Sequence, residues 1–174
     1  MKFQIRHTTK ADLTAIKELY KAVATNQRGI ARSEAEITDK YINQVWEGIQ
    51  AEGLGMLVLD EERVIGEIHA SKKGLGIFDH ILSHLTIGVH PDYQGKGVGK
   101  MLFHHFLAFV VKERPEISRV ELEARASNVA GLKLYESQGF VLEGRMINQT
   151  KNLDGSHEDG VMYAWFNPAY SADL

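Results

Sequence analysis

The sequence predicts an α/β protein in which one mixed sheet packs against helices, within a single domain of residues 1–174. Two observations carry this prediction. Strand-like runs are interspersed with segments of helical periodicity, in the order β α α β β β α β α β β. The chain has 174 residues, of which 44% are hydrophobic and 25% charged, an ordinary balance for one globular domain.

The first half is expected to hold a strand, two helices and a hairpin. Thr9 and Asp12 form a helix-start box ahead of one apolar stripe, and Ser33 and Glu36 form a second box ahead of another. The polar pair at residues 61–62 separates two apolar runs, as the turn of a hairpin does. The expected elements are a strand over residues 3–7, a helix ending near 26–29, a helix stopping near Gly53, and hairpin strands over 55–60 and 63–73.

The second half is expected to alternate strands with two helices. Apolar residues at 98, 101, 102, 106, 109 and 110 have helical spacing. Ser127 or Asn128 can cap a second helix, which Gly139 then ends. The expected elements are a loop over residues 74–80, a strand over 81–90, helices over 98–112 and 128–138, a strand over 119–124, and closing strands over 140–151 and 159–166 around a turn at 152–158.

Composition excludes several classes of function. The formal net charge of −3 does not favour a nucleic-acid or membrane partner, and no apolar run has the length of a transmembrane helix. The N-terminus becomes polar too early for a signal peptide, so we expect a cytoplasmic protein. The chain has no cysteine, which excludes disulfides and a cysteinyl intermediate. The histidines do not suggest a metal site.

A glycine-rich segment, "VHPDYQGKGVGKML" over Val89–Leu102, follows a predicted strand and precedes a predicted helix. Such a turn points backbone N–H groups at an anion, and the helix N-terminus adds partial positive charge. A P-loop is excluded because Met101 stands where the magnesium-binding hydroxyl belongs. A dinucleotide fingerprint fits poorly because Lys100 occupies the position of its third glycine.

Two motifs, separated by a helix and a strand, point to one family. Gln94, Gly97 and Gly99 follow the pattern Gln/Arg-x-x-Gly-x-Gly/Ala, and the later motif reads "ARASNVAGLKLYESQGF". Together they resemble the GCN5-related N-acetyltransferase (GNAT) family, strongly from residue 85 to 144. The resemblance implies a mixed, mostly antiparallel sheet of about seven strands, flanked by four helices, with splayed central strands.

The resemblance also implies acetyl-CoA as cofactor and a set of residues that bind it. The loop's N–H groups would hold the pyrophosphate, with Gln94 closing the loop and Lys96 and Lys100 adding charge. A backbone N–H near Val89, on the splayed strand, would polarise the thioester carbonyl, and Gly88 would allow a bulge there. The predicted cofactor-binding residues are Ile87, Val89, Gln94, Gly95, Lys96, Gly97, Val98, Gly99, Lys100, Asn128 and Tyr135.

Acetyl transfer to an amine needs a base and an acid. Glu123 is the first candidate for the base, because it lies five residues before Asn128, where similar N-terminal acetyltransferases carry a glutamate. Glu121, Glu67 and His84 remain open as alternatives. Tyr135 is the candidate acid, since the ordinary pKa of a phenol, near 10, is close to that of a coenzyme thiol. The lack of cysteine predicts direct attack in a ternary complex.

The acceptor is less defined than the cofactor. The motifs resemble both bacterial enzymes that acetylate the N-terminal alanine of a ribosomal protein and relatives that acetylate small amines. The acceptor is therefore an amine-bearing small molecule or a peptide N-terminus, and the first two helices and the turn at 152–158 would shape its cleft. The resemblance allows a homodimer through the closing strands. The alternative function is a coenzyme-A-binding sensor without turnover.

Overall fold

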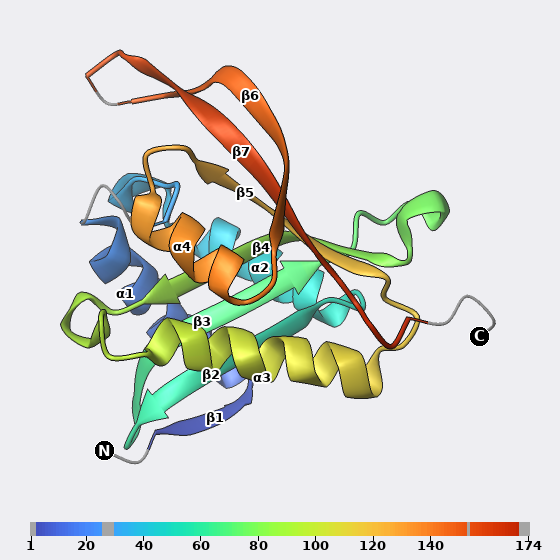
Figure 1. Ribbon diagram of the computed structural model, residues 1–174. Helices are drawn as coiled ribbons and strands as arrows, with labels where there is room; N and C mark the ends of the chain where they lie inside the picture. The colour runs from blue at the N-terminus through green and yellow to red at the C-terminus, as the bar shows by residue number, and fades with distance from the viewer. Residues whose placement is uncertain (1–2, 26–29, 153, 171–174) are drawn as a thin grey trace.

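A computed structural model describes residues 3–25, 30–152 and 154–170 (Figure 1). Its sheet has seven strands in the order β1-β2-β3-β4-β5-β7-β6, antiparallel except for the parallel pair β4–β5. The strands are β1 (Gln4–His7), β2 (Leu54–Asp60), β3 (Arg63–Ser71), β4 (Ile81–Val89), β5 (Arg119–Arg125), β6 (Val141–Lys151) and β7 (His157–Phe166). The α-helices are α1 (Leu13–Ala24), α2 (Asp39–Gln50), α3 (Val98–Glu113) and α4 (Val129–Ser137). The predicted mixed, mostly antiparallel sheet with four helices is confirmed.

Helices cover both faces of the sheet. On one face, α1 and α2 bury their apolar stripes against side chains such as Leu57 and Leu59 of β2. On the other face, α3 packs on Met56 and Val58, the alternate residues of the same strand. Because both faces are covered, β2 reads as a continuous apolar run rather than as an alternating one. Among the described residues, no helix has the length and apolar character needed to cross a membrane.

The second helix begins later than its sequence box predicts. Ser33 and Glu36 do form a capping box, but it starts a separate 3-10 turn over Glu34–Glu36. Helix α2 begins only after Thr38, whose hydroxyl accepts a hydrogen bond from the Tyr41 N–H at 3.2 Å. The predicted start of this helix is therefore wrong. The predicted end of the first helix, near residues 26–29, lies outside the described residues.

The central strands β4 and β5 separate beyond a short paired stretch. Within the described chain, their parallel pairing is confined to Ile81 and Leu82 facing Arg119 and Val120. Just beyond, β4 carries one more residue than β3, and His84 has a positive φ of 57° there. A bulge bends the strand that carries it. This bulge lies at the point where β4 leaves β5, so the predicted splayed strands are present.

The bulge is not at Gly88, where the sequence suggested it. Gly88 pairs regularly with Glu67 of β3. The absence of a side chain at Gly88 serves packing instead, because an added Cβ would lie 3.1 Å from the Tyr20 ring on α1. The prediction misjudged which constraint required the glycine.

Candidate active site

The glycine-rich loop lies between a short 3-10 turn and the N-terminus of α3. Gly95 and Gly97 have φ values of 71° and 82°, in the left-handed region that favours glycine. Gly99 has a different role, because an added Cβ would lie 3.1 Å from Leu134 of α4. The amide of Gln94 donates to the Val89 carbonyl at 3.1 Å and so ties the loop to β4. Two glycines therefore shape the loop and the third lets α3 approach α4.

A cavity of about 380 Å³ opens beside this loop. It is lined by residues of the loop, of β4 and of α4, and these include every predicted cofactor-binding residue except Lys96. The Lys96 ammonium lies instead 5.1 Å from the centre of the Tyr93 ring. Lys100 does line the cavity. The prediction for Lys96 therefore lacks support from the position of its side chain.

The backbone of β4 faces the gap between the splayed strands. On the β3 side, the His90 N–H donates to the Ile65 carbonyl at 2.9 Å. Bonded and non-bonded pairs alternate along an antiparallel ladder. Ile87 and Val89 therefore direct their own N–H and C=O groups away from β3, toward the gap. The Val89 carbonyl accepts from Gln94, and the other three groups fit the polar part of an extended cofactor arm.

Asn128 and Tyr135 connect the loop to a second cavity. The Asn128 side chain caps α4 by accepting a hydrogen bond from the Gly131 N–H at 3.1 Å. Tyr135 lies about two turns further along the same helix, packed against the rings of Phe103 and Tyr163. Both Asn128 and Tyr135 line the two cavities, as does Ile87. Asn128 therefore caps α4, as predicted, and lies where the two cavities meet.

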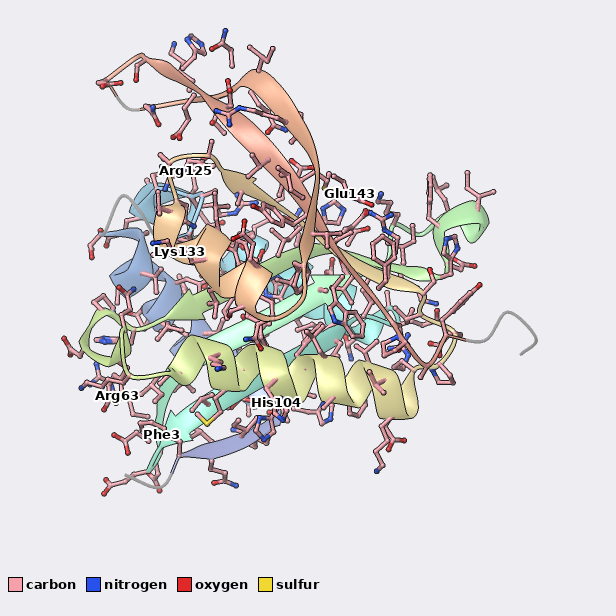
Figure 2. The ribbon with its side chains drawn as sticks, viewed as in Figure 1. Phe3, Arg63, His104, Arg125, Lys133 and Glu143 are labelled. Atoms are coloured by element: carbon pink, nitrogen blue, oxygen red, sulfur yellow. The ribbon has the colours of Figure 1, made fainter. Side chains whose placement is uncertain are left out.

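The second cavity, of about 570 Å³, has charged walls from several elements. Glu121, Glu123 and Arg125 come from β5, Lys73 follows β3, and Arg32 precedes α2. Arg125, labelled in Figure 2 at the end of β5, also lies 4.0 Å from Glu158 of β7. A cavity with both signs of charge suits a polar amine rather than an apolar ligand.

Of the four candidate bases, Glu123 and His84 are exposed and line the larger cavity. The Glu123 carboxylate accepts a hydrogen bond from the Gln149 amide at 3.1 Å. Glu121 also lines the cavity, but its Oε1 lies 2.6 Å from the Lys73 ammonium and accepts a hydrogen bond from the Ser83 hydroxyl at 2.7 Å. Burial opposes ionisation of Glu121, yet these partners outweigh it and lower its pKa. Glu121 is therefore a poor proton acceptor.

Glu67 lies in a different place from the other candidates. It is fully buried between the sheet and α1, where it accepts a hydrogen bond from the Tyr20 hydroxyl and lies 3.1 Å from His69 Nδ1. It lines neither cavity. This position separates Glu67 from the space that an amine would occupy.

Burial raises the pKa of Tyr135 to about 12. The proton is therefore held more tightly than the ordinary phenol pKa near 10 predicts. A thiolate formed in the same buried place would be destabilised by the same loss of water, which also raises the pKa of the thiol. The difference between the pKa of Tyr135 and that of the thiol is therefore smaller than it would be if only Tyr135 were buried. Among the described residues, the Tyr135 hydroxyl has no hydrogen-bond partner. The hydroxyl is thus protonated at neutral pH and available to donate.

The acceptor side was the part that sequence reasoning described least well. The turn at 152–158 contributes no described residue to the larger cavity, contrary to expectation. Its acidic residues are occupied elsewhere; Asp154, for example, accepts from the Ser156 N–H at 2.9 Å. The charged lining residues that were missed are Arg125, Lys73 and Arg32, whose guanidinium lies 3.9 Å over the Tyr41 ring. Arg32 and Lys73 belong to no motif, so no local signal marked them, whereas Arg125 lies within the second motif.

Comparisons with known proteins show the family of the chain. The model of the acetyltransferase (GNAT) family matches residues 13–140. The L-amino acid N-acyltransferase MnaT of Escherichia coli (strain K12) is 32% identical over 148 residues, which cover 82% of this chain and 81% of that protein. The ribosomal protein bS18-alanine N-acetyltransferase of the same strain is 38% identical over 79 residues, which cover 45% of this chain and 51% of that protein.

A comparison with solved structures gives the same fold. The structure of YncA from Salmonella typhimurium, described as a putative acetyltransferase with its cofactor acetyl-CoA, has a TM-score of 0.84 to this chain at 20% identity. The superposition covers 99% of this chain and 98% of that one, so the two share a fold. With the family match and a relative 32% identical over most of both chains, the chain belongs to the GNAT family and is an acetyl-CoA-dependent N-acetyltransferase.

Proposed function

We propose that this enzyme moves the acetyl group to a primary amine by direct attack in a ternary complex, with Glu123 as base and Tyr135 as acid. The acceptor is a small amine such as an amino acid, or a peptide N-terminus. The observation that carries the proposal is the pair of cavities that meet at Ile87, Asn128 and Tyr135. One cavity suits the cofactor and the other an amine, so two substrates can be held together.

The residues beside the loop fit acetyl-CoA. The N–H groups from Gly95 to Lys100 and the N-terminus of α3 suit its pyrophosphate, and the backbone of Ile87 and Val89 suits its extended arm. Bound acetyl-CoA supplies the acetyl group and, after transfer, a thiolate leaving group. The Val89 N–H would donate toward the carbonyl oxygen, where negative charge develops.

Two proton transfers fall to side chains of this chain. An alkyl amine is charged at neutral pH, so Glu123 accepts a proton from it, directly or through water, before attack. Tyr135 donates its phenolic proton to the departing sulfur, and the second proton that the nitrogen loses as the amide forms returns to Tyr135, so that one proton in total leaves through Glu123. The chain has no cysteine, which leaves no thiol to carry the acetyl group between the two substrates. Direct attack requires that acceptor and cofactor are bound at the same time.

Tyr135→Phe is expected to lower kcat by about 10²-fold, within the range for loss of one acid–base group, with coenzyme A affinity retained. The change removes only a hydroxyl that has no partner among the described residues, so the core should remain intact. Tyr163→Phe is the matched control, because its hydroxyl donates to Glu136 at 2.8 Å, away from the cavities. Steady-state kinetics and calorimetric titration with coenzyme A measure both effects. A wild-type kcat for Tyr135→Phe would remove this residue from the mechanism.

A screen for release of the coenzyme A thiol tests the function itself. Amino acids, polyamines and peptides with free N-termini are compared as acceptors, with acetyl-CoA alone as the blank. We expect amine-dependent release, and reciprocal velocity plots that intersect because both substrates bind before reaction. Parallel plots would contradict the ternary complex. Binding of coenzyme A without turnover on any amine would favour the sensor function.

A further inference from the structure

Strand β6 contains an irregular segment opposite the candidate base. Met146 pairs with Gly160 of β7 and Thr150 pairs with Glu158, so residues 147–149 together face the single residue Asp159. Asn148 has a positive φ of 53° in this bulge.

Asp159 fixes the bulge. Its carboxylate accepts hydrogen bonds from the Asn148 N–H at 2.9 Å and from Arg145 Nε at 2.6 Å. These bonds favour the charged carboxylate and lower the pKa of Asp159, the backbone bond contributing most. The bulge therefore has a defined shape.

The bulge directs Gln149 to the face of the sheet that carries Glu123. In β5, Glu123 and Arg125 point to one face, and Arg125 pairs with Gly160. Paired residues share a face, so Gly160 offers its empty side-chain position there. Gln149 fills it: a Cβ added to Gly160 would lie 1.5 Å from Gln149 Oε1. From this position Gln149 Nε2 donates to Glu123 Oε2 at 3.1 Å.

We propose that Gln149 is a positioning residue that holds the Glu123 carboxylate toward the larger cavity. This inference rests on the proposed function, in which Glu123 is the base. Glu123 is exposed on its strand, so its side chain has several rotamers available. The hydrogen bond from the Gln149 amide to Glu123 Oε2 selects one of these rotamers and leaves Oε1 to take the proton of the amine. A held base reacts faster than a mobile one because the geometry is set before reaction.

Gln149→Leu removes the donor at similar volume. We expect kcat to fall about tenfold, a fraction of the 10²–10⁴-fold that a general base contributes, with KM for acetyl-CoA unchanged. Gly160→Ala should have a similar effect, because its methyl group displaces the flexible end of Gln149. Gly144→Ala is the matched control on β6, since an added Cβ there meets no atom within 4 Å.

A double-mutant cycle with Glu123→Gln separates positioning from a structural role of the hairpin. If Gln149 acts through Glu123, Gln149→Leu costs nothing further once Glu123 is replaced. The same tenfold loss in both backgrounds would overturn the inference. The side-chain NH₂ signals of Gln149 in NMR spectra should also move in Glu123→Gln and Gly160→Ala, and stay in place in Gly144→Ala. Unmoved signals in Glu123→Gln would disprove the contact.

Separate results would refute the role of Glu123 as base and the role of Gln149 as its positioning residue. A wild-type rate for Glu123→Gln refutes the base, and with it the role of Gln149. A wild-type kcat for Gln149→Leu, beside an impaired Glu123→Gln, refutes the role of Gln149 alone.

Discussion

Glu123→Gln is expected to lower kcat by about 10²–10⁴-fold, the range for loss of a positioned general base. The amide keeps the shape of the side chain but cannot accept the proton of an ammonium group. Glu123 is exposed, so stability should be unaffected, and the cofactor cavity does not include it. Calorimetric titration should therefore give an unchanged Kd for coenzyme A. Initial rates at saturating acetyl-CoA and acceptor measure the loss.

Two further variants make this result specific. Glu62→Gln changes an exposed carboxylate in the β2–β3 turn and should retain wild-type kinetics. His84→Gln tests the other exposed candidate in the larger cavity. A wild-type rate for Glu123→Gln together with a large loss for His84→Gln would transfer the role of base to the histidine.

Gly97→Val is expected to weaken coenzyme A binding about 10²–10³-fold. Gly97 has a φ of 82°, and a β-branched residue there costs roughly 1–3 kcal/mol or forces the loop into another conformation. In another conformation the loop loses one or more N–H bonds to phosphate, each worth about 1.5–3 kcal/mol, and each 1.4 kcal/mol is tenfold in Kd. Calorimetric titration with coenzyme A measures the change.

Gly155→Val provides the control for backbone strain. Gly155 lies in the β6–β7 turn with a φ of 85°, and like Gly97 it has open space around an added Cβ. The two variants should lose similar stability in thermal unfolding, but Gly155→Val should bind coenzyme A as the wild type does. Unchanged affinity in Gly97→Val would remove the loop from the cofactor site.

The sequence predicted most of what depends on local pattern. The order of elements followed from hydrophobic periodicity, and the loop followed from three glycines at fixed spacing before a helix. Ten of the eleven predicted cofactor residues line one cavity, because backbone shape and neighbouring helix ends are encoded locally. Lys96 is the exception, since the direction of a long exposed side chain depends on its neighbours.

Features that depend on tertiary contacts were not predictable. The bulge in β4 lies at His84 and not at Gly88, because the ring of Tyr20, distant in sequence, is what requires a glycine at 88. In the bulge of β6, the position with positive φ is Asn148 rather than a glycine, so no glycine marks the bulge in the sequence. The carboxylate of Asp159, on the neighbouring strand β7, holds it in place. Arg32 and Lys73 reach the larger cavity from segments without motifs. The acceptor side is assembled from distant side chains, so its pattern is not local.

The bulge of residues 147–149 has a second consequence, for association between molecules. β6 is an outermost strand, and such a strand presents unpaired N–H and C=O groups that can template pairing with another chain. The bulge interrupts that row, and the exposed side chain of Ile147 falls inside the interruption. A homodimer through the closing strands would need side chains such as Val141 and Leu142 instead of a continuous intermolecular ladder. The segment that holds Gln149 thereby also limits edge-to-edge aggregation.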